Sequence, residues 1–195
     1  MDFVGFPKIP RLSREIIITE KIDGTNAQIY IADDRAPITL QSGRVVPFLC
    51  GSHKRYVFPE NDNYGFAKWA YENVDAILEL LGPGRHFGEW WGQGIQRGYG
   101  LKEKRFSLFS VTRWEDQPLP LGVFVVPILM SYPVFNTFII DSTLGNLVSM
   151  GSAAAPGYMN PEGIVVYHTQ GGVLFKKTIL NDEVPKGVVD VLVHS

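Results

Sequence analysis

The stretch ITEKIDGTNAQIYI, residues Ile18–Ile31, determines how we interpret the fold of this chain. Its two ends are rich in β-branched and aromatic residues, which are enriched in β-strands. The run DGTN at residues 23–26 consists of residues that are typical of turns. We therefore predict a β-hairpin with strands over residues 15–19 and 27–31, in which Lys21 lies at the mouth of the turn.

The rest of the chain alternates predicted strands with two predicted helices. Apolar residues recur at helical spacing from Phe66 to Leu81, with Asn63 as the expected N-cap and a Gly-Pro-Gly stop at residues 82–84. A second helix is predicted over residues 135–150. The class is therefore α+β with largely antiparallel sheets. Further strands are predicted over residues 36–58 (two strands around a glycine turn), 85–92, 105–114, 122–130, 162–168 and 171–179, the last two as a hairpin.

The composition limits the classes of protein to consider. The 195 residues are 45% hydrophobic, enough to bury the core of one domain that spans residues 1–195. Eighteen basic and twenty acidic residues give a net charge of −2, so the total charge does not indicate a polyanion partner. Cys50 is the only cysteine, which excludes an internal disulfide and a cysteine-based zinc site and favours a reducing, cytoplasmic location. No apolar run reaches the ~18 residues of a membrane span, and we find no signal-peptide pattern, so no membrane contact is expected.

Five short motifs stand in order along the chain. They are EKIDGTN at residues 20–26, HFGEWWG at 86–92, RFSLF at 105–109, PEGIVVY at 161–167 and LFKK at 174–177. Each motif alone is weak, whereas the ordered set is far more specific. The set resembles the ATP-dependent RNA ligases, a family of the covalent nucleotidyltransferase superfamily of ligases and capping enzymes. The threonine and asparagine of the first motif look more like the RNA ligase branch than the DNA ligase or capping-enzyme branches.

This resemblance implies a fold, a reaction and its cofactors. The implied fold is an α+β nucleotidyltransferase (ATP-grasp-like) adenylation domain, built from antiparallel sheets with flanking helices. In the implied reaction a lysine takes AMP from ATP, passes it to a 5′-phosphate, and a 3′-hydroxyl then displaces it, with Mg²⁺ or Mn²⁺ as the metal ion. The expected partners are ATP and the ends of nicked or broken RNA, or of DNA. We expect the protein to be a monomer that acts in nucleic-acid repair.

The same resemblance assigns roles to individual residues. Lys21 would be the nucleophile, and because lysine side chains are protonated at neutral pH, the site must favour the neutral amine. Glu89 would contact the ribose, Phe109 would stack on adenine, and Glu162 would bind the metal ion. Strand alternation places Phe106 and Phe109 on opposite faces, so one of them is expected to fill the core; family position alone favours Phe109 for stacking and leaves Phe106 for the core. The other expected nucleotide contacts are Glu20, Asp23, Asn26, Arg55, Lys176 and Lys177.

Two positions depart from the family pattern. Lys176 and Lys177 are adjacent instead of being separated by one residue, so strand alternation sends them to opposite faces. Only one of them can reach the α-phosphate; we favour Lys176, and the choice stays open. The arginine expected after the first motif is best matched by Arg55 in the basic run HKR at residues 53–55, with Arg44 as a weaker match. The alternative role for these basic residues is to protect an exposed strand edge.

A basic loop between the second and third motifs is the expected nucleic-acid contact. It has the sequence QGIQRGYGLKEKR at residues 93–105, with Tyr99 among the basic residues. Phosphate contacts there would weaken steeply with salt. A plain solvated loop is the alternative. The expected nucleic-acid contacts are Arg97, Lys102, Lys104 and Arg105.

The length of the chain leaves alternatives open. Ligases of this superfamily commonly carry a further C-terminal domain, and only residues 178–195 follow the last motif, so no separate C-terminal domain is expected. The chain would be a minimal ligase, a catalytic domain that needs a partner domain or protein, or a fragment. Alternative functions are a DNA ligase or capping-type nucleotidyltransferase and, in another class, a catalytically weak module that binds nucleic-acid ends. The presence of Lys21, Glu89 and Glu162 together argues against the last.

Overall fold

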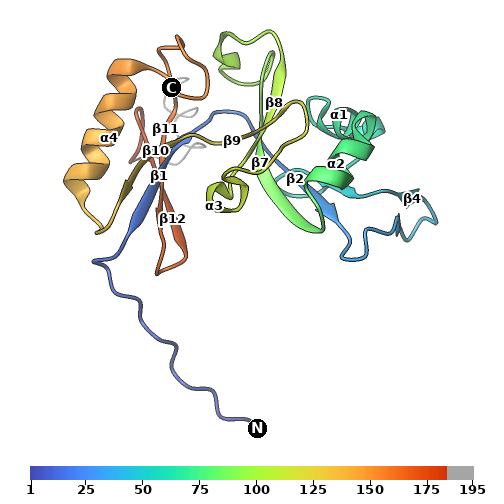
Figure 1. Cartoon of the computed structure of the whole chain (residues 1–195), viewed down its shortest axis with the longest axis horizontal. Coiled ribbons are helices and arrows are strands. Elements are labelled where there is room, and N and C mark those ends of the chain that lie inside the picture. Colours follow the sequence, from blue (N-terminus) through green and yellow to red (C-terminus); the bar gives the residue numbers. More distant parts are fainter. Residues whose placement is uncertain (184–195) are drawn as a thin grey trace, which may run out of the picture. The chain divides into compact units, whose positions relative to one another are not determined.

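The chain forms two compact units in a computed structural model that describes residues 1–183 (Figure 1). The split unit consists of residues 1–21 and the chain from Ile128 onward, and the inserted unit consists of residues 22–127. The inserted unit thus interrupts the split unit between Lys21 and Ile128. The expectation that no separate C-terminal domain follows the last motif depends on residues 178–195, of which residues 184–195 lie outside the described part of the chain.

The split unit is a four-stranded antiparallel sheet with one long helix. The strand order is β10 (Ile128–Tyr132), β1 (Ile16–Lys21), β11 (Gly163–His168) and β12 (Val173–Thr178). Helix α4 (Thr137–Met150) packs its apolar side chains on one face of this sheet, which we call the α4 face. The Asn136 side chain accepts hydrogen bonds from the first turn of α4, which fixes where the helix begins. The buried core consists of Ile16, Ile18, Ile140, Leu147, Ile164 and Val166.

The strand register assigns each residue of β1 to one face of the sheet. Directly paired residues of neighbouring antiparallel strands point to the same face, and successive residues point to opposite faces. Glu20 pairs with Ile164, a core residue, so Glu20 lies on the α4 face. Lys21 and Thr19 therefore lie on the other face, which we call the Lys21 face.

The inserted unit contains a six-stranded sheet covered by short helices. The strand order is β6-β5-β2-β7-β8-β9, antiparallel except for the parallel pair of β8 and β9. The strands are β2 (Thr25–Ile31), β5 (Leu49–Gly51), β6 (Tyr56–Val57), β7 (Gly84–Gly92), β8 (Lys104–Leu108) and β9 (Val123–Val125), with a separate pair of β3 (Ile38–Thr39) and β4 (Val45–Val46). The helices are η1 (Pro59–Asn61), α1 (Phe66–Glu72), α2 (Val74–Leu80), η2 (Gly98–Gly100) and α3 (Val111–Trp114).

An aromatic core joins α1 to one face of the six-stranded sheet. Phe66 lies with its ring centre 5.5 Å from that of Trp90 and 5.1 Å from that of Phe106. Ile29 of β2 and Ile77 of α2 are fully buried in the same cluster. The opposite face of the sheet, which we call the open face, therefore carries Asn26, Gln28 and Tyr30 of β2, Arg85, Phe87, Glu89 and Trp91 of β7, and the side chains that pair with them.

The predicted hairpin over residues 15–31 is wrong. Both strands exist, but β1 pairs with β10 and β11 whereas β2 pairs with β5 and β7, so they belong to different sheets and different units. The run DGTN leads from one sheet to the other. Gly24 is required by close approach, because a Cβ atom there would lie 2.6 Å from the Trp90 carbonyl oxygen. The turn residues at 23–26 correctly predict that the chain breaks between two strands. They do not predict which strands each of the two pairs with.

Three further predictions needed correction at element boundaries. The helix predicted over residues 66–81 is broken at Asn73 into α1 and α2. The carboxylate of Asp62, rather than Asn63, accepts hydrogen bonds from backbone N–H groups of the first turn of α1. The strands predicted over 105–114 and 122–130 are shorter: the first ends before α3, and the second is divided by Pro127, which has no N–H to donate, into β9 and β10.

Other predictions are confirmed. The mixed α+β class with antiparallel sheets holds, as do helix α4 and the terminal hairpin of β11 and β12. Within residues 1–183, none of the helices has the length and apolar character needed to cross a membrane.

Candidate active site

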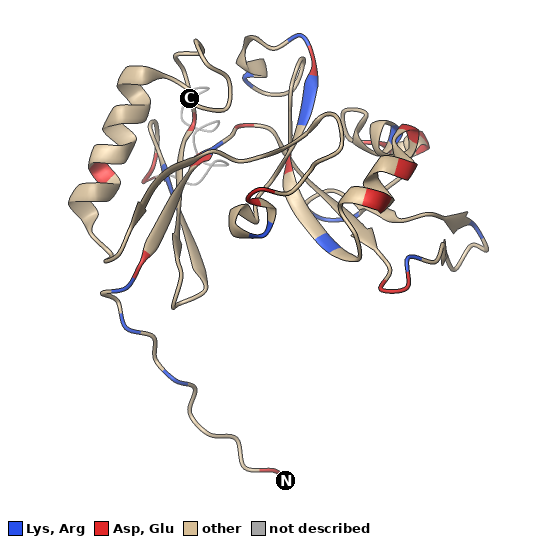
Figure 2. Cartoon of the chain, viewed as in Figure 1, with Lys and Arg blue, Asp and Glu red and all other residues tan. Residues whose placement is uncertain are grey.

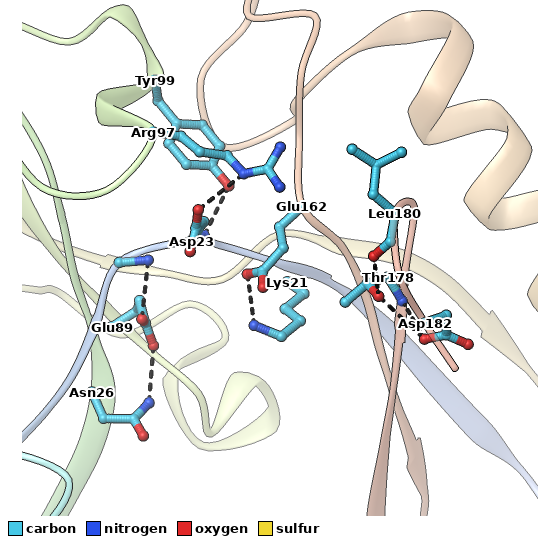
Figure 3. A network of polar contacts seen from close by, with 11 residues as sticks. Lys21, Asp23, Asn26, Glu89, Arg97, Tyr99, Glu162, Thr178, Leu180 and Asp182 are labelled. Carbon is cyan, nitrogen blue, oxygen red and sulfur yellow. Dashed lines mark hydrogen bonds and ion pairs between the residues drawn. The ribbon is translucent and has the colours of Figure 1, made fainter. Parts of the chain in front are cut away.

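The predicted nucleophile Lys21 is the last residue of β1 and forms an ion pair with Glu162. Its Nζ atom lies 2.6 Å from Glu162 Oε2 (Figure 3). The pairing of Lys21 with Gly163 brings these two residues together, because Glu162 directly precedes β11. The Lys21 side chain is 22% exposed, whereas the Glu162 side chain is buried. The pair therefore holds an accessible amine against a buried carboxylate.

The two adjacent lysines of β12 lie on opposite faces, as predicted. Lys177 pairs with Ile164 and so lies on the α4 face, where its Nζ atom is 2.6 Å from Asp141 Oδ1 of α4. The hydrogen bond to that carboxylate raises the pKa of Lys177. Lys176 pairs with Val165, which also pairs with Thr19, so Lys176 is exposed on the Lys21 face. The register thus brings Lys176, and not Lys177, to the face that carries Lys21.

Glu20 lies on the α4 face, away from Lys21. Its buried carboxylate accepts hydrogen bonds from the Ser152 hydroxyl at 2.6 Å and from the N–H groups of Ala153 at 2.8 Å and Ala154 at 2.9 Å. Burial raises the pKa of Glu20, although these three hydrogen bonds oppose the rise. The structure does not bring Glu20 together with Lys21 and Glu162. Its contacts instead join the end of β1 to the loop that follows α4.

In the inserted unit, Glu89 is bound to the segment that follows Lys21. Its carboxylate accepts hydrogen bonds from the Gly24 N–H at 3.2 Å and from Asn26 Nδ2 at 3.1 Å (Figure 3). Asn26 pairs with Glu89 across β2 and β7, so both side chains lie on the open face. The Asn26 Oδ1 atom in turn lies 3.1 Å from His53 Nδ1. Glu89 therefore has protein partners, and its contact with a ribose, which the family resemblance implies, stays a prediction.

Asp23 is held by the loop that was predicted to contact nucleic acid. The Nε atom of Arg97 lies 2.9 Å from Asp23 Oδ2, and the Asp23 N–H donates to the Tyr99 hydroxyl at 2.8 Å (Figure 3). Tyr99 is buried and adopts a positive φ of 51° within η2. This ion pair directs Arg97 towards the protein. The loop therefore fixes the residue two positions after Lys21.

Phe109 and Glu89 lie on the same face of the six-stranded sheet. Glu89 pairs with Ser107, and Phe109 follows at the alternating position directly after β8. Phe109 is exposed, whereas Phe106 is fully buried in the core, which confirms the expectation that Phe106 fills the interior. An exposed ring on the same face as a buried carboxylate is an arrangement suited to binding a nucleoside.

The other basic residues are mostly held by local partners. The ribbon coloured by charge shows basic positions at several separate places (Figure 2). Lys104 donates to the Tyr64 carbonyl at 2.7 Å, and Arg105 pairs with Glu103. Arg55 donates to the Asn61 carbonyl at 3.0 Å. Lys102 is exposed, and Arg44 pairs with Glu60. Of the four residues predicted to contact nucleic acid, Arg97, Lys104 and Arg105 therefore have partners within the protein.

Carboxylate oxygens are the ligands that Mg²⁺ and Mn²⁺ prefer in proteins. Within the part of the chain that the structure describes, no group of three or more His, Cys, Asp or Glu side chains is placed to hold a metal ion. Glu162 supplies a single buried carboxylate at the Lys21 amine. This donor suits an ion that takes most of its ligands from water and phosphate oxygens.

Sequence reasoning missed the residues that support the site. Tyr99, Ser152 and Asp141 bind Asp23, Glu20 and Lys177 across 76, 132 and 36 residues, respectively. No local pattern marks such partners. His53, which contacts Asn26, lies in the basic run HKR, but the family pattern calls for an arginine there and therefore favours Arg55.

The chain matches the RNA ligase family over residues 14–178. It is also similar to solved structures of an RNA ligase from Naegleria gruberi. A variant with ATP and Mn has a TM-score of 0.56 and 18% identity, covering 86% of this chain and 50% of that one. A variant with AMP and Mn has a TM-score of 0.57 and 19% identity, with 86% and 50% covered. The structure with PPi has a TM-score of 0.56 and 19% identity, with 93% and 52% covered.

The chain therefore spans about half the length of these solved structures. No curated protein sequence matches it. At sequence identities of 18% to 19%, the similarity to these structures shows a shared fold and nothing more.

Proposed function

Because the chain belongs to the RNA ligase family, we propose that it is an ATP-dependent polynucleotide ligase that forms a covalent lysyl-AMP intermediate on Lys21. The observation that carries the proposal is the ion pair of Lys21 with the buried Glu162, on a sheet face that also presents Lys176. RNA is the favoured substrate, since EKIDGTN resembles the RNA ligase branch of the superfamily.

The proposed reaction has three displacements at phosphorus. First, Lys21 Nζ loses a proton and attacks the α-phosphorus of ATP; an N–P bond forms, and the P–O bond to pyrophosphate breaks. Second, an oxygen of the RNA 5′-phosphate attacks the same phosphorus, and the N–P bond breaks as the amine regains a proton. Third, a 3′-hydroxyl loses its proton and its oxygen attacks the 5′-phosphorus; the new P–O bond seals the strand as the P–O bond to AMP breaks and AMP leaves.

Glu162 has two roles in this proposal. Its Oε2 atom accepts a hydrogen bond from Lys21 Nζ at 2.6 Å, which orients the amine and offers an acceptor for its proton. Its carboxylate would also hold the divalent ion that the family implies. When bound there, the ion would supply positive charge that neutralises phosphate oxygens and favours the uncharged amine.

Other residues are proposed to bind the nucleotide. Lys176, exposed on the Lys21 face, would neutralise the α-phosphate as charge develops on it. Glu89, held by Gly24 and Asn26, would accept hydrogen bonds from the ribose, and Phe109 would stack on adenine. The related solved structures hold ATP, AMP and Mn, which supports these ligands for this chain as well.

Self-adenylylation tests the proposal directly. The purified protein is incubated with ATP labelled at the α-phosphate and with Mg²⁺ or Mn²⁺, and the label is followed on a denaturing gel. We expect a labelled protein band for the wild type and none for Lys21→Ala, because only Nζ can form the N–P bond. Lys68→Ala, which removes an exposed lysine of α1, is the matched control and should label normally.

Intact mass measured beforehand shows whether the preparation already carries AMP. The absence of an adduct with either metal, on protein shown to be free of AMP, would refute the proposal and favour a module that only binds nucleic-acid ends. Once the AMP adduct is observed, the rates at which the protein seals nicked RNA and nicked DNA show which substrate it prefers. Labelling without sealing would indicate that the later steps need a partner domain or protein.

A further inference from the structure

A row of side chains crosses the open face of the six-stranded sheet beside Glu89. Gln28 of β2 pairs with Phe87 of β7 on one side and with Gly51 of β5 on the other, and Gly51 pairs with Tyr56 of β6. Directly paired residues share a face, so Phe87, Gln28 and Tyr56 all belong to the open face. Phe109 extends the row at one end, since its N–H donates to the Phe87 carbonyl at 2.9 Å.

The aromatic rings of this row are accessible to solvent. Phe87 is 49% exposed, Tyr56 is 44% exposed and Phe109 is 41% exposed. The opposite face of the same strands buries its aromatic residues almost completely. Phe109 has a proposed partner in adenine, whereas neither the core nor the adenylylation site accounts for Phe87 and Tyr56. Several exposed rings in one row mark a binding surface.

The space between the two rings is lined by polar groups. The Gln28 side chain lies over Gly51, where a Cβ atom would come within 2.8 Å of Gln28 Cγ. Gln28 Oε1 accepts a hydrogen bond from Arg85 at 2.6 Å, and the Arg85 guanidinium lies 4.8 Å from the ring centre of Tyr30. Arg85 alternates with Phe87 along β7 and so lies on the open face as well. The surface thus combines exposed rings, a fixed amide and a fixed cation.

This chemistry favours one class of occupant. Unpaired nucleobases stack on exposed aromatic rings of a sheet, while their phosphates are attracted to arginine side chains. An apolar protein surface would instead have to bury Gln28 and Arg85, which is costly. Phe87 and Tyr56 lie three strands apart, or about 14 Å at the usual strand spacing, so they contact different bases.

We propose that this row binds an unpaired stretch of a nucleic-acid strand, with separate bases stacked on Phe87 and Tyr56 and a phosphate near Arg85. The identity of the strand rests on the proposed function, which makes it the RNA that carries an end to be sealed. Recognition by stacking is tolerant of sequence, because every base presents an aromatic face. The row therefore contributes affinity for single strands rather than a preference for particular bases.

Direct binding tests the proposal without ATP. A fluorescently labelled oligouridine is titrated with the full chain at low salt, and its anisotropy gives the Kd. We expect Phe87→Ala and Tyr56→Ala each to weaken binding by about tenfold, the lower end of what one stacked base contributes. Phe138→Ala is the matched control, because it removes a 73% exposed ring from α4 in the other unit; it should bind like the wild type.

Salt and a second variant separate stacking from charge and from misfolding. Arg85→Gln should lower the slope of log Kd against log salt concentration, whereas Phe87→Ala should leave that slope unchanged. If Phe87→Ala does not fold, Phe87→Leu keeps the apolar volume, lacks the aromatic face, and should show the same weakening.

Two results would overturn the inference. One is wild-type protein that does not bind the oligonucleotide at low salt; the other is ring variants that bind it as well as Phe138→Ala does, which would point to a protein partner for the row. Both outcomes are independent of lysyl-AMP formation. Failure of the proposed function would appear in the ATP labelling experiment, with this binding comparison unaffected.

Discussion

The two faces of the four-stranded sheet both carry charged side chains, but these side chains have different surroundings. On the α4 face, Glu20 and Lys177 are bound by partners within the fold: Glu20 by Ser152 and two backbone N–H groups, and Lys177 by Asp141. On the Lys21 face, Lys21 and Lys176 are accessible to a ligand. The pleat of the strand thus separates residues that are adjacent in sequence into a set bound within the fold and a set accessible to a ligand.

The largest effect expected from this comparison concerns the two glutamates. Glu162→Gln removes the charge that orients the Lys21 amine, and we expect the rate of self-adenylylation to fall by about a thousandfold. Glu20→Gln, the matched change on the α4 face, should alter the rate by less than about threefold, since Glu20 does not contact Lys21. Rates of label incorporation from ATP measure both. Equal losses in the two variants would mean that the faces are not functionally distinct.

The two lysines of β12 give the next largest difference. Lys176→Ala should slow self-adenylylation by about a hundredfold, because the proposed cationic contact to the reacting phosphate would be lost. Lys177→Ala breaks an exposed ion pair with Asp141, and such pairs contribute less than about 1 kcal/mol to stability. The same assay, with melting temperatures as the folding control, decides between them. A larger loss of rate in Lys177→Ala would reverse the proposed roles of the two lysines.

A stability effect is expected on the α4 face. Glu20→Ala leaves the Ser152 hydroxyl and the N–H groups of Ala153 and Ala154 without their acceptor, and we expect a loss of about 2 kcal/mol in the free energy of unfolding. Ser152→Ala removes one of these donors and should cost about 1 kcal/mol. Urea denaturation measures both losses. A Glu20→Ala variant as stable as the wild type would show that this carboxylate does not fix the loop.

The smallest effect is a pH dependence of stability. Burial raises the pKa of Glu20 above its ordinary value of 4.5, so the folded chain binds this proton at higher pH than the unfolded chain does. The stability that the proton confers is present below the ordinary pKa and is lost as the pH rises through the raised pKa. The free energy of unfolding of the wild type, relative to Glu20→Gln, should therefore increase as the pH is lowered from about 8 towards 4.5. A decrease would show that the hydrogen bonds to Glu20 outweigh its burial.

Local patterns predicted most elements of the fold but not their partners. The strands at residues 15–19 and 27–31, helix α4 and the terminal hairpin are visible as alternation, helical spacing and turn residues. The assignment of β1 and β2 to different sheets is not, because it depends on pairings with β11 and β7, far along the chain. A hairpin is the shorter connection, but β1 and β2 each pair on both sides with other strands.

The candidate site was predictable where chemistry is local. Lys21, Glu89 and Glu162 stand in ordered motifs, and the adjacency of Lys176 and Lys177 is enough to place them on opposite faces. Which lysine shares a face with Lys21 required the register of three strands. The ion pair of Asp23 with Arg97 was not predictable, because a basic loop looks the same in sequence whether its charges face solvent or a carboxylate.

The insertion of residues 22–127 between two paired strands makes the chain modular. Lys21 ends β1 and Ile128 begins β10, and these strands are neighbours in the sheet, with Thr19 opposite Ile128 after a shift of register between Ile18 and Thr19. A short β-turn could therefore replace the whole insert and leave the amine and its carboxylate on a small scaffold. The inserted unit is, in engineering terms, a cassette that could be exchanged for another unit without rebuilding the strands that carry Lys21.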